Sequence, residues 1–114
     1  MKPGELVLVR FPEASLTPGK LRPALVVAIA PGRYTDVLLA LVTSRTYQEV
    51  PEFDEVISVA DEDFAATRLK STSVIRLARL VTVGAEIIEG RLGTISAARL
   101  RRVRQRLVEW LRAQ

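Results

Sequence analysis

Any catalysis by this chain must use Arg, Lys, carboxylate or hydroxyl side chains, because its 114 residues include no Cys and no His. The lack of both types removes thiolate chemistry, the usual general base and the commonest metal ligand. Two short stretches concentrate the remaining candidates: Lys20 and Arg22, then Thr43, Ser44 and Arg45. Taken alone, Arg22 is better explained as an exposed ion pair at a strand end, the commoner role of a surface Arg. Joint use in one site requires a fold that brings the two stretches together.

Each stretch borders a continuous apolar run, at residues 24–30 and 37–42. Runs of this length predict strands that are covered on both faces. Pro23 has no backbone N–H to donate, which suits the first residue of a strand. The turn between the runs, residues 31–36, is short and predicts that the two strands are antiparallel neighbours. The start of the first strand then lies beside the end of the second, so we expect Arg22 and Thr43 to meet.

The two faces of the first run differ in side-chain size. One face carries bulky residues: Leu25, Val27 and Ile29. The other carries mostly small ones: Ala24, Val26, Ala28 and Ala30. Because side chains alternate across a sheet, the bulky face is expected to fill the core. The small face permits close approach, and we expect either a helix or a second subunit to pack there.

The rest of the chain predicts more strands and one final helix. Strands are expected at residues 5–11, 54–59, 73–77, 79–83 and 87–92, and one helical turn at 61–66. Ser96 is placed to cap the final helix, with Ile95 and Leu100 as its hydrophobic staple. Its apolar stripe is Leu100, Val103, Leu107, Trp110 and Leu111. The cations expected off the stripe are Arg99, Arg101, Arg102, Arg106 and Arg112.

These elements predict a single domain over residues 1–114 with one core. The fold class is mainly β (α+β), with several short strands followed by one helix. Such an order forms a small barrel or a twisted sheet against which the helix packs.

Charge is unevenly distributed along the chain. The net charge is +4, yet residues 49–63 contain seven carboxylates and no Lys or Arg. The basic remainder favours a polyanion such as nucleic acid, although a soluble protein of high pI explains the charge equally well. We expect the acidic stretch to face away from a nucleic-acid groove or to gate it. No leader or membrane-spanning run is recognisable, which predicts a cytoplasmic protein with no membrane partner.

Several short segments, in order, resemble the MazF/PemK family of toxin–antitoxin ribonucleases. They are GELVLV at 4–9 with FP at 11–12, KLRPALVV at 20–27, LVTS at 41–44, LKSTSVIRL at 69–77, LVTV at 80–83 and GTIS at 93–96. The resemblance implies an SH3-like small barrel of about six to seven strands with a C-terminal amphipathic helix. It also implies a homodimer and a cognate antitoxin protein as partner.

The resemblance further implies an endoribonuclease that cleaves single-stranded RNA without a metal or other cofactor. The ribose 2′-hydroxyl attacks the adjacent phosphate and leaves a 2′,3′-cyclic phosphate. Family members use an Arg and a Thr at the positions of Arg22 and Thr43, and a planar Arg fork matches the charge that gathers on the phosphoryl oxygens. Lys20, Ser44 and Arg45 are candidates for contacts to the RNA backbone. The proton acceptor stays unassigned: the loop after the first strand lacks the Phe-Thr-Asp common in relatives, and Glu13 is its one acid.

Two other functions fit the same fold. A non-catalytic nucleic-acid-binding module would bind oligonucleotides and leave them intact. A protein-directed toxin, like the topoisomerase poisons that share this fold, would use the Arg-rich helix and would not need Arg22.

Overall fold

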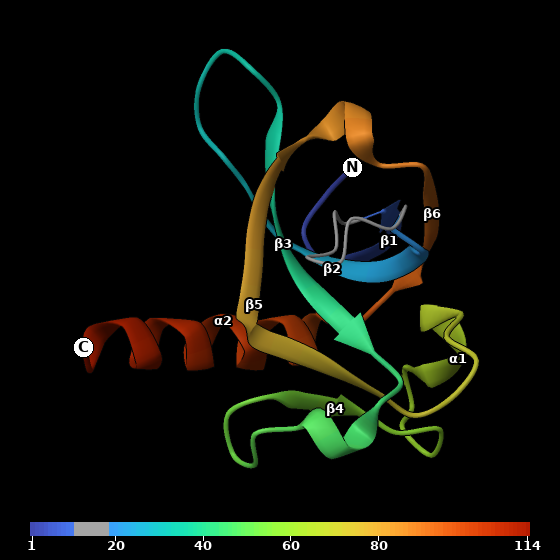
Figure 1. Ribbon diagram of the computed structural model, residues 1–114. Coiled ribbons are helices and arrows are strands. Elements are labelled where there is room, and N and C mark those ends of the chain that lie inside the picture. The colour runs from blue at the N-terminus through green and yellow to red at the C-terminus, as the bar shows by residue number, and fades with distance from the viewer. Residues whose placement is uncertain (11–18) are drawn as a thin grey trace.

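The structure, a computed structural model, describes residues 1–10 and 19–114 (Figure 1). Its strands are β1 (Glu5–Arg10), β2 (Leu21–Ile29), β3 (Asp36–Thr43), β4 (Glu55–Ile57), β5 (Ser73–Gly84) and β6 (Gly90–Thr94). Its α-helices are α1 (Phe64–Thr67) and α2 (Ala97–Arg112), and two 3-10 turns span Thr46–Gln48 and Ala85–Ile87. Phe11, the predicted end of the first strand, lies outside the described residues.

The described strands form one antiparallel sheet in the order β4-β5-β3-β2-β1-β6. The sheet curls into a half barrel, and α2 lies along it (Figure 1). The predicted fold class, a mainly β small barrel with a C-terminal helix, is confirmed. In the part of the chain that the structure describes, no helix is both long and apolar enough to cross a membrane.

The two long apolar runs pair as predicted. β2 and β3 are antiparallel neighbours, with Leu25 opposite Ala40 and Ala24 opposite Leu41. The start of β2 therefore lies beside the end of β3. On its other edge β3 pairs with β5, and Thr43 lies opposite Val74. Three segments distant in sequence thus meet at one rim of the sheet.

The predicted bend between residues 77 and 79 is an irregularity inside one long strand, β5. Ala40 of β3 pairs with Leu80, but the next residue, Leu41, pairs with Arg76. Residues 77–79 are therefore extra on the β5 side. Asp54, only 2% exposed, holds this point, because its carboxylate accepts the Leu77 N–H at 2.9 Å and lies 3.3 Å from Arg76 Nε.

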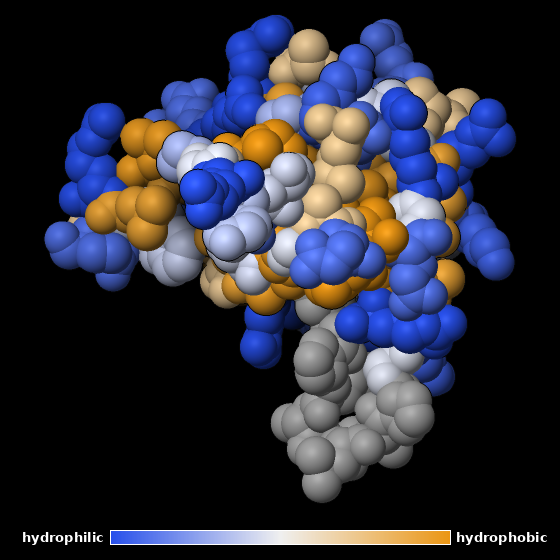
Figure 2. Space-filling view, turned by 90° about the horizontal axis from the view of Figure 1, so that it is seen from above, coloured by the Kyte–Doolittle hydropathy of each residue, from blue (hydrophilic) through white to orange (hydrophobic). Residues whose placement is uncertain are grey.

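The small face of β2 is closed by the sheet itself, and the expectation that the helix packs there is wrong. Ala24 and Val26 are fully buried in a cluster with four other residues: Val7, Val9, Val37 and Leu39. The second half of β5 curls over this cluster, so Val81 and Val83 pack against it, as does Ile88. These three side chains are themselves only partly buried. Figure 2 shows this end of the molecule from above, with apolar side chains in the middle and hydrophilic ones around them.

Helix α2 packs instead on the bulky face of β2. Val103 and Leu107 are buried with Leu25 and Val27 in the larger core cluster. Leu100 and Trp110 pack against that cluster, whereas Leu111 is 61% exposed and lies off the core. The Ser96 cap is confirmed, because its hydroxyl accepts the Arg99 N–H at 3.1 Å.

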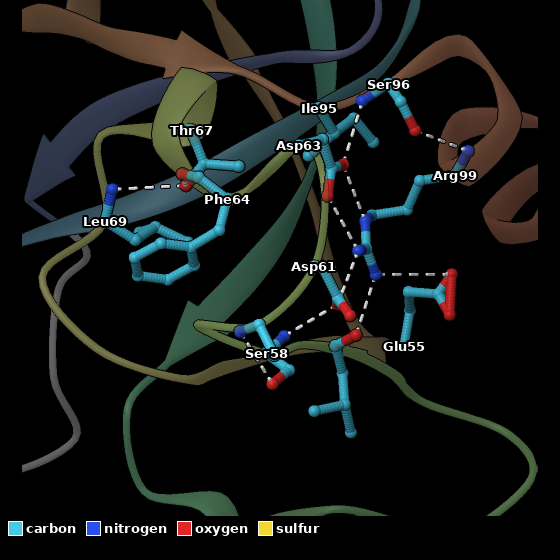
Figure 3. A network of polar contacts seen from close by, with 12 residues as sticks. Glu55, Ser58, Asp61, Asp63, Phe64, Thr67, Leu69, Ile95, Ser96 and Arg99 are labelled. Atoms are coloured by element: carbon cyan, nitrogen blue, oxygen red, sulfur yellow. Dashed lines mark hydrogen bonds and ion pairs between the residues drawn. The ribbon is translucent and has the colours of Figure 1, made fainter.

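Arg99 was expected off the helix stripe, and the structure corrects this. Its side chain is 5% exposed and forms ion pairs with the acidic segment before α1 (Figure 3). Nε and Nη2 donate to the two oxygens of Asp63 at 2.9 and 2.8 Å, and Nη2 also donates to Asp61 at 2.8 Å. Nη1 donates to the Val56 carbonyl of β4 at 2.7 Å. A charge this deep is tolerated because each of its nitrogen atoms has a partner.

This network shifts the pKa of its members. Hydrogen bonds from Arg99 lower the pKa of Asp63 from 3.8 to about 2. The pKa of Asp61 is also lowered, first by the backbone N–H of Ser58 and then by Arg99. Hydrogen bonding to Asp63 raises the pKa of Arg99, so the guanidinium is charged at all accessible pH.

The substitution Asp63→Asn should lower the free energy of unfolding by about 3 kcal/mol, because it leaves the buried Arg99 charge with one close carboxylate partner fewer. Urea unfolding near neutral pH measures this. Glu62→Gln, a change at the exposed neighbouring acid, is the control and should unfold as the wild type does. Equal midpoints for Asp63→Asn and wild type would contradict the assignment.

Stability should also fall as acid protonates Asp63. Because the pKa of Asp63 is lower in the folded chain, its contribution is present above about pH 4 and disappears between about pH 4 and pH 2. The shift corresponds to about 2 kcal/mol. Urea midpoints of wild type and Asp63→Asn should therefore converge over this window. A difference that stays constant down to the acid end would count against the pKa shift.

Candidate functional site

A groove of about 530 Å³ opens at the rim where β2 begins, β3 ends and β5 begins. All five candidate residues from the two polar stretches line it: Lys20, Arg22, Thr43, Ser44 and Arg45. The remaining lining residues are Leu8, Leu21, Pro23, Val42, Arg68, Leu69, Lys70, Ser71, Ser73 and Leu92. The fold therefore joins the two stretches at one surface.

Arg22 and Thr43 face the groove because of the β2–β3 register. Ala24 lies opposite Leu41. Two residues nearer the rim are Arg22 on β2 and Thr43 on β3, because the strands run in opposite directions. Since side chains alternate, both point to the same face as Ala24 and Leu41. Arg22 is half-buried, and Thr43 is only 8% exposed. The paired strands thus hold the Arg22 guanidinium and the Thr43 hydroxyl in the lining of one groove.

The Thr43 hydroxyl has a defined orientation. Its oxygen accepts the backbone N–H of Arg45 at 3.1 Å. With one lone pair engaged in this way, the hydroxyl is free to donate its own proton to a ligand oxygen. The same hydrogen bond turns the chain after β3, so Ser44 and Arg45 stay at the groove.

The loop from α1 to β5, together with the first residue of β5, adds four polar residues that sequence reasoning did not assign: Arg68, Lys70, Ser71 and Ser73. They reach the groove because β5 is the second neighbour of β3 and begins where β3 ends. The run of cations and hydroxyls at residues 68–73 was a usable signal, but only together with this strand pairing.

Tight packing at Gly93 of β6 anchors that loop. A side chain on Gly93 would collide with the backbone carbonyl oxygens of Ala66 and Thr67. Thr67 is fully buried, and its hydroxyl oxygen accepts the Leu69 N–H at 3.2 Å. Arg68 ends α1 in the left-handed region at φ 60°, an uncommon conformation for a residue other than Gly. The loop therefore leaves α1 in a fixed direction, toward the groove.

The groove has a strong positive bias. Five cations line it, and none of the described residues that line it is an Asp or Glu. Four carboxylates of the acidic stretch are engaged by other cations, because Asp54, Glu55, Asp61 and Asp63 pair with Arg side chains of β5 and α2. Within residues 1–10 and 19–114, no carboxylate forms an ion pair with Lys20, Arg45, Arg68 or Lys70. Glu13 lies outside the described residues.

Such a surface can bind and stabilise negative charge on a phosphate chain. Arg guanidinium groups match phosphate oxygens in pairs, and hydroxyls add shorter hydrogen bonds. In the described part of the chain, no group of three or more acidic residues is placed to hold a metal ion.

Comparison with known proteins gives one family. No curated protein matches the chain at a significant level. The family model described as "PemK-like, MazF-like toxin of type II toxin-antitoxin system" matches residues 2–111, nearly the whole sequence. The groove lies within this match, and so does the antiparallel pairing that forms it. The chain therefore belongs to the PemK-like, MazF-like family of toxins of type II toxin–antitoxin systems.

Proposed function

We propose that this toxin is an endoribonuclease that cleaves single-stranded RNA in the groove at the ends of β2 and β3. The observation that carries the proposal is the composition of that groove: five cations and four hydroxyls, with no carboxylate among the described lining residues. RNA offers the matching ligand, because every nucleotide carries one negative phosphate. The groove also has apolar walls, including Leu8 and Leu92, against which a base can lie.

Cleavage begins when the ribose 2′-oxygen attacks the adjacent phosphorus. A new P–O2′ bond forms, the P–O5′ bond breaks, and the 5′-oxygen leaves with a proton as a 5′-hydroxyl. The other product ends in a 2′,3′-cyclic phosphate. No water molecule takes part in this step, because every bond that forms or breaks lies within the RNA. The net proton transfer is from O2′ to O5′.

Arg22 and Thr43 supply the stabilisation. Arg22 places its guanidinium against the phosphoryl oxygens, where negative charge gathers in the transition state. The Thr43 hydroxyl, oriented by the Arg45 N–H, donates to a phosphoryl oxygen and keeps O2′ in line with the leaving oxygen. Catalysis then rests on positioning and electrostatics, and needs no metal.

The other cations of the groove, together with Ser44, bind the RNA backbone. Lys20, Ser44 and Arg45 contact phosphates on one side of the cleaved bond, and Arg68 and Lys70 contact phosphates on the other. These contacts set affinity and register but carry no sequence information.

The groove is also the surface that a cognate antitoxin must block. An acidic, extended segment does this best, because its charge complements that of the groove. We propose a homodimer as the working form, in keeping with the family.

Purified wild-type protein should cleave single-stranded RNA in the presence of EDTA and leave cyclic phosphate and 5′-hydroxyl ends. Arg22→Ala should reduce the rate by about 100-fold or more, because it removes a donor to the developing charge. Thr43→Ala should also reduce it strongly. Arg101→Ala removes an exposed cation from α2 and is the matched control, with unchanged cleavage expected.

Three outcomes would overturn this proposal. One is intact RNA after incubation with the wild type. Another is a digest that Arg22→Ala does not slow. A third is binding without cleavage, which would identify a nucleic-acid-binding module instead.

Arg68→Ala and Lys70→Ala should each weaken RNA binding to a similar degree whatever the sequence. Each should also reduce the slope of log affinity against log salt by about 0.7, the value for one lost phosphate contact on a single strand. Fluorescence anisotropy with labelled RNA, on a Thr43→Ala background that prevents cleavage, measures the slope. Arg112→Ala at the end of α2 is the control. An unchanged slope for both loop variants would remove this loop from the RNA-binding surface.

A further inference from the structure

A second hollow lies beside the groove, on the same face of the sheet. It encloses about 490 Å³ and is lined by Leu41, Tyr47, Gln48, Arg76 and Arg79. Leu41 stands two residues before Thr43 on β3, so their side chains point to the same side, about 7 Å apart along the strand. A smaller hollow of about 170 Å³ shares Leu41 and Arg79 and continues along β5 over Leu80 and Val81. A chain that leaves the groove past Thr43 therefore enters this hollow next.

The walls of the hollow are fixed by the irregularity in β5. The extra residues 77–79 direct Arg79 outward, beside Leu41. Arg76 is tied at both ends of its guanidinium, since Nε lies 3.3 Å from the buried Asp54 and Nη1 donates to Gln48 at 3.0 Å. The Arg76–Gln48 hydrogen bond thus links the 3-10 turn Thr46–Gln48 to the sheet, and this link holds the backbone that carries Tyr47.

Three side chains of the hollow have the chemistry of nucleotide recognition. The Tyr47 ring is 79% exposed, so a large flat surface is open to stacking. The Gln48 amide oxygen accepts from Arg76, which leaves the amide NH₂ to donate to an acceptor on a base edge. Arg79 is exposed, and among the described residues no carboxylate pairs with it. An aromatic surface, an oriented amide and an unneutralised cation together fit one nucleotide.

We infer that this hollow is a second RNA subsite, which takes the nucleotide that flanks the cleaved bond. The inference rests on the proposed function and adds to it where sequence preference arises. The base stacks on Tyr47 and presents an acceptor to Gln48, while Arg79 holds its phosphate. The groove supplies affinity for any RNA strand, and the hollow supplies a contact that depends on the base.

The test is RNA binding on the Thr43→Ala background, with a fluorescein-labelled pool of RNA octanucleotides of random sequence. Tyr47→Ala should weaken binding by about 10-fold, the loss expected for one base–aromatic stack. Tyr47→Phe keeps the ring and should bind as its parent does. Tyr34→Ala is the matched control, because Tyr34 is 74% exposed in the loop at the other end of β3 and should have no effect.

Cleavage of a random RNA pool by proteins with Thr43 intact gives a second readout. Gln48→Ala should relax the base preference at one position next to the cut, while cleavage itself continues. Binding that is unaltered by Tyr47→Ala, in a protein that does bind RNA, would overturn the subsite and leave the proposed function standing. No RNA binding by the parent protein would overturn both. Weaker binding together with a change of mass in sedimentation would assign Tyr47 to a contact between copies, against the inference.

Discussion

The buried charge of Arg99 is the constraint on which the arrangement of this protein depends. Its guanidinium is 5% exposed, and an unpaired charge at that depth would cost several kcal/mol. Its partners come from separate parts of the chain: the Asp61 and Asp63 segment before α1, and the Val56 carbonyl of β4 (Figure 3). In the observed position of the helix this residue has all of these partners, and Val103 and Leu107 complete the larger core.

The same pairing divides the surface by charge. Glu55, at the start of β4, lies 3.1 Å from Arg102 and 3.7 Å from Arg106, so two cations of α2 neutralise this carboxylate as well. No carboxylate is among the described residues that line the groove with Lys20, Arg45, Arg68 and Lys70. A protein with a net charge of only +4 can in this way present a strongly basic groove. The cations that form structural ion pairs on α2 are thus different residues from the cations proposed to bind RNA in the groove.

Strand pairing decides which residues share the groove and what lies next to it. β3 is central: β2 on one edge brings Arg22 to the rim where Thr43 lies, and β5 on the other brings the loop with Arg68 and Lys70. The irregularity opposite Leu41 adds three residues to β5. It forms the hollow lined by Tyr47 and Arg79, which begins at Leu41, two residues before Thr43 on β3. Irregular pairing of this kind commonly redirects side chains next to functional sites. One edge-to-edge order of strands thus accounts for both surfaces.

The sequence by itself was enough for the features that depend on neighbouring residues. Apolar runs and a short turn predict β2 and β3 as antiparallel partners, and hence the meeting of Arg22 and Thr43; Ser96 predicts the start of α2. Only the tertiary structure decided the rest. A helical wheel places Arg99 with the other cations, and cannot show that its partner Asp63 lies 36 residues earlier. The small face of β2 is covered by the curl of its own sheet, and Arg68 joins the groove through β5. Each of these depends on long-range pairing, which local periodicity does not encode.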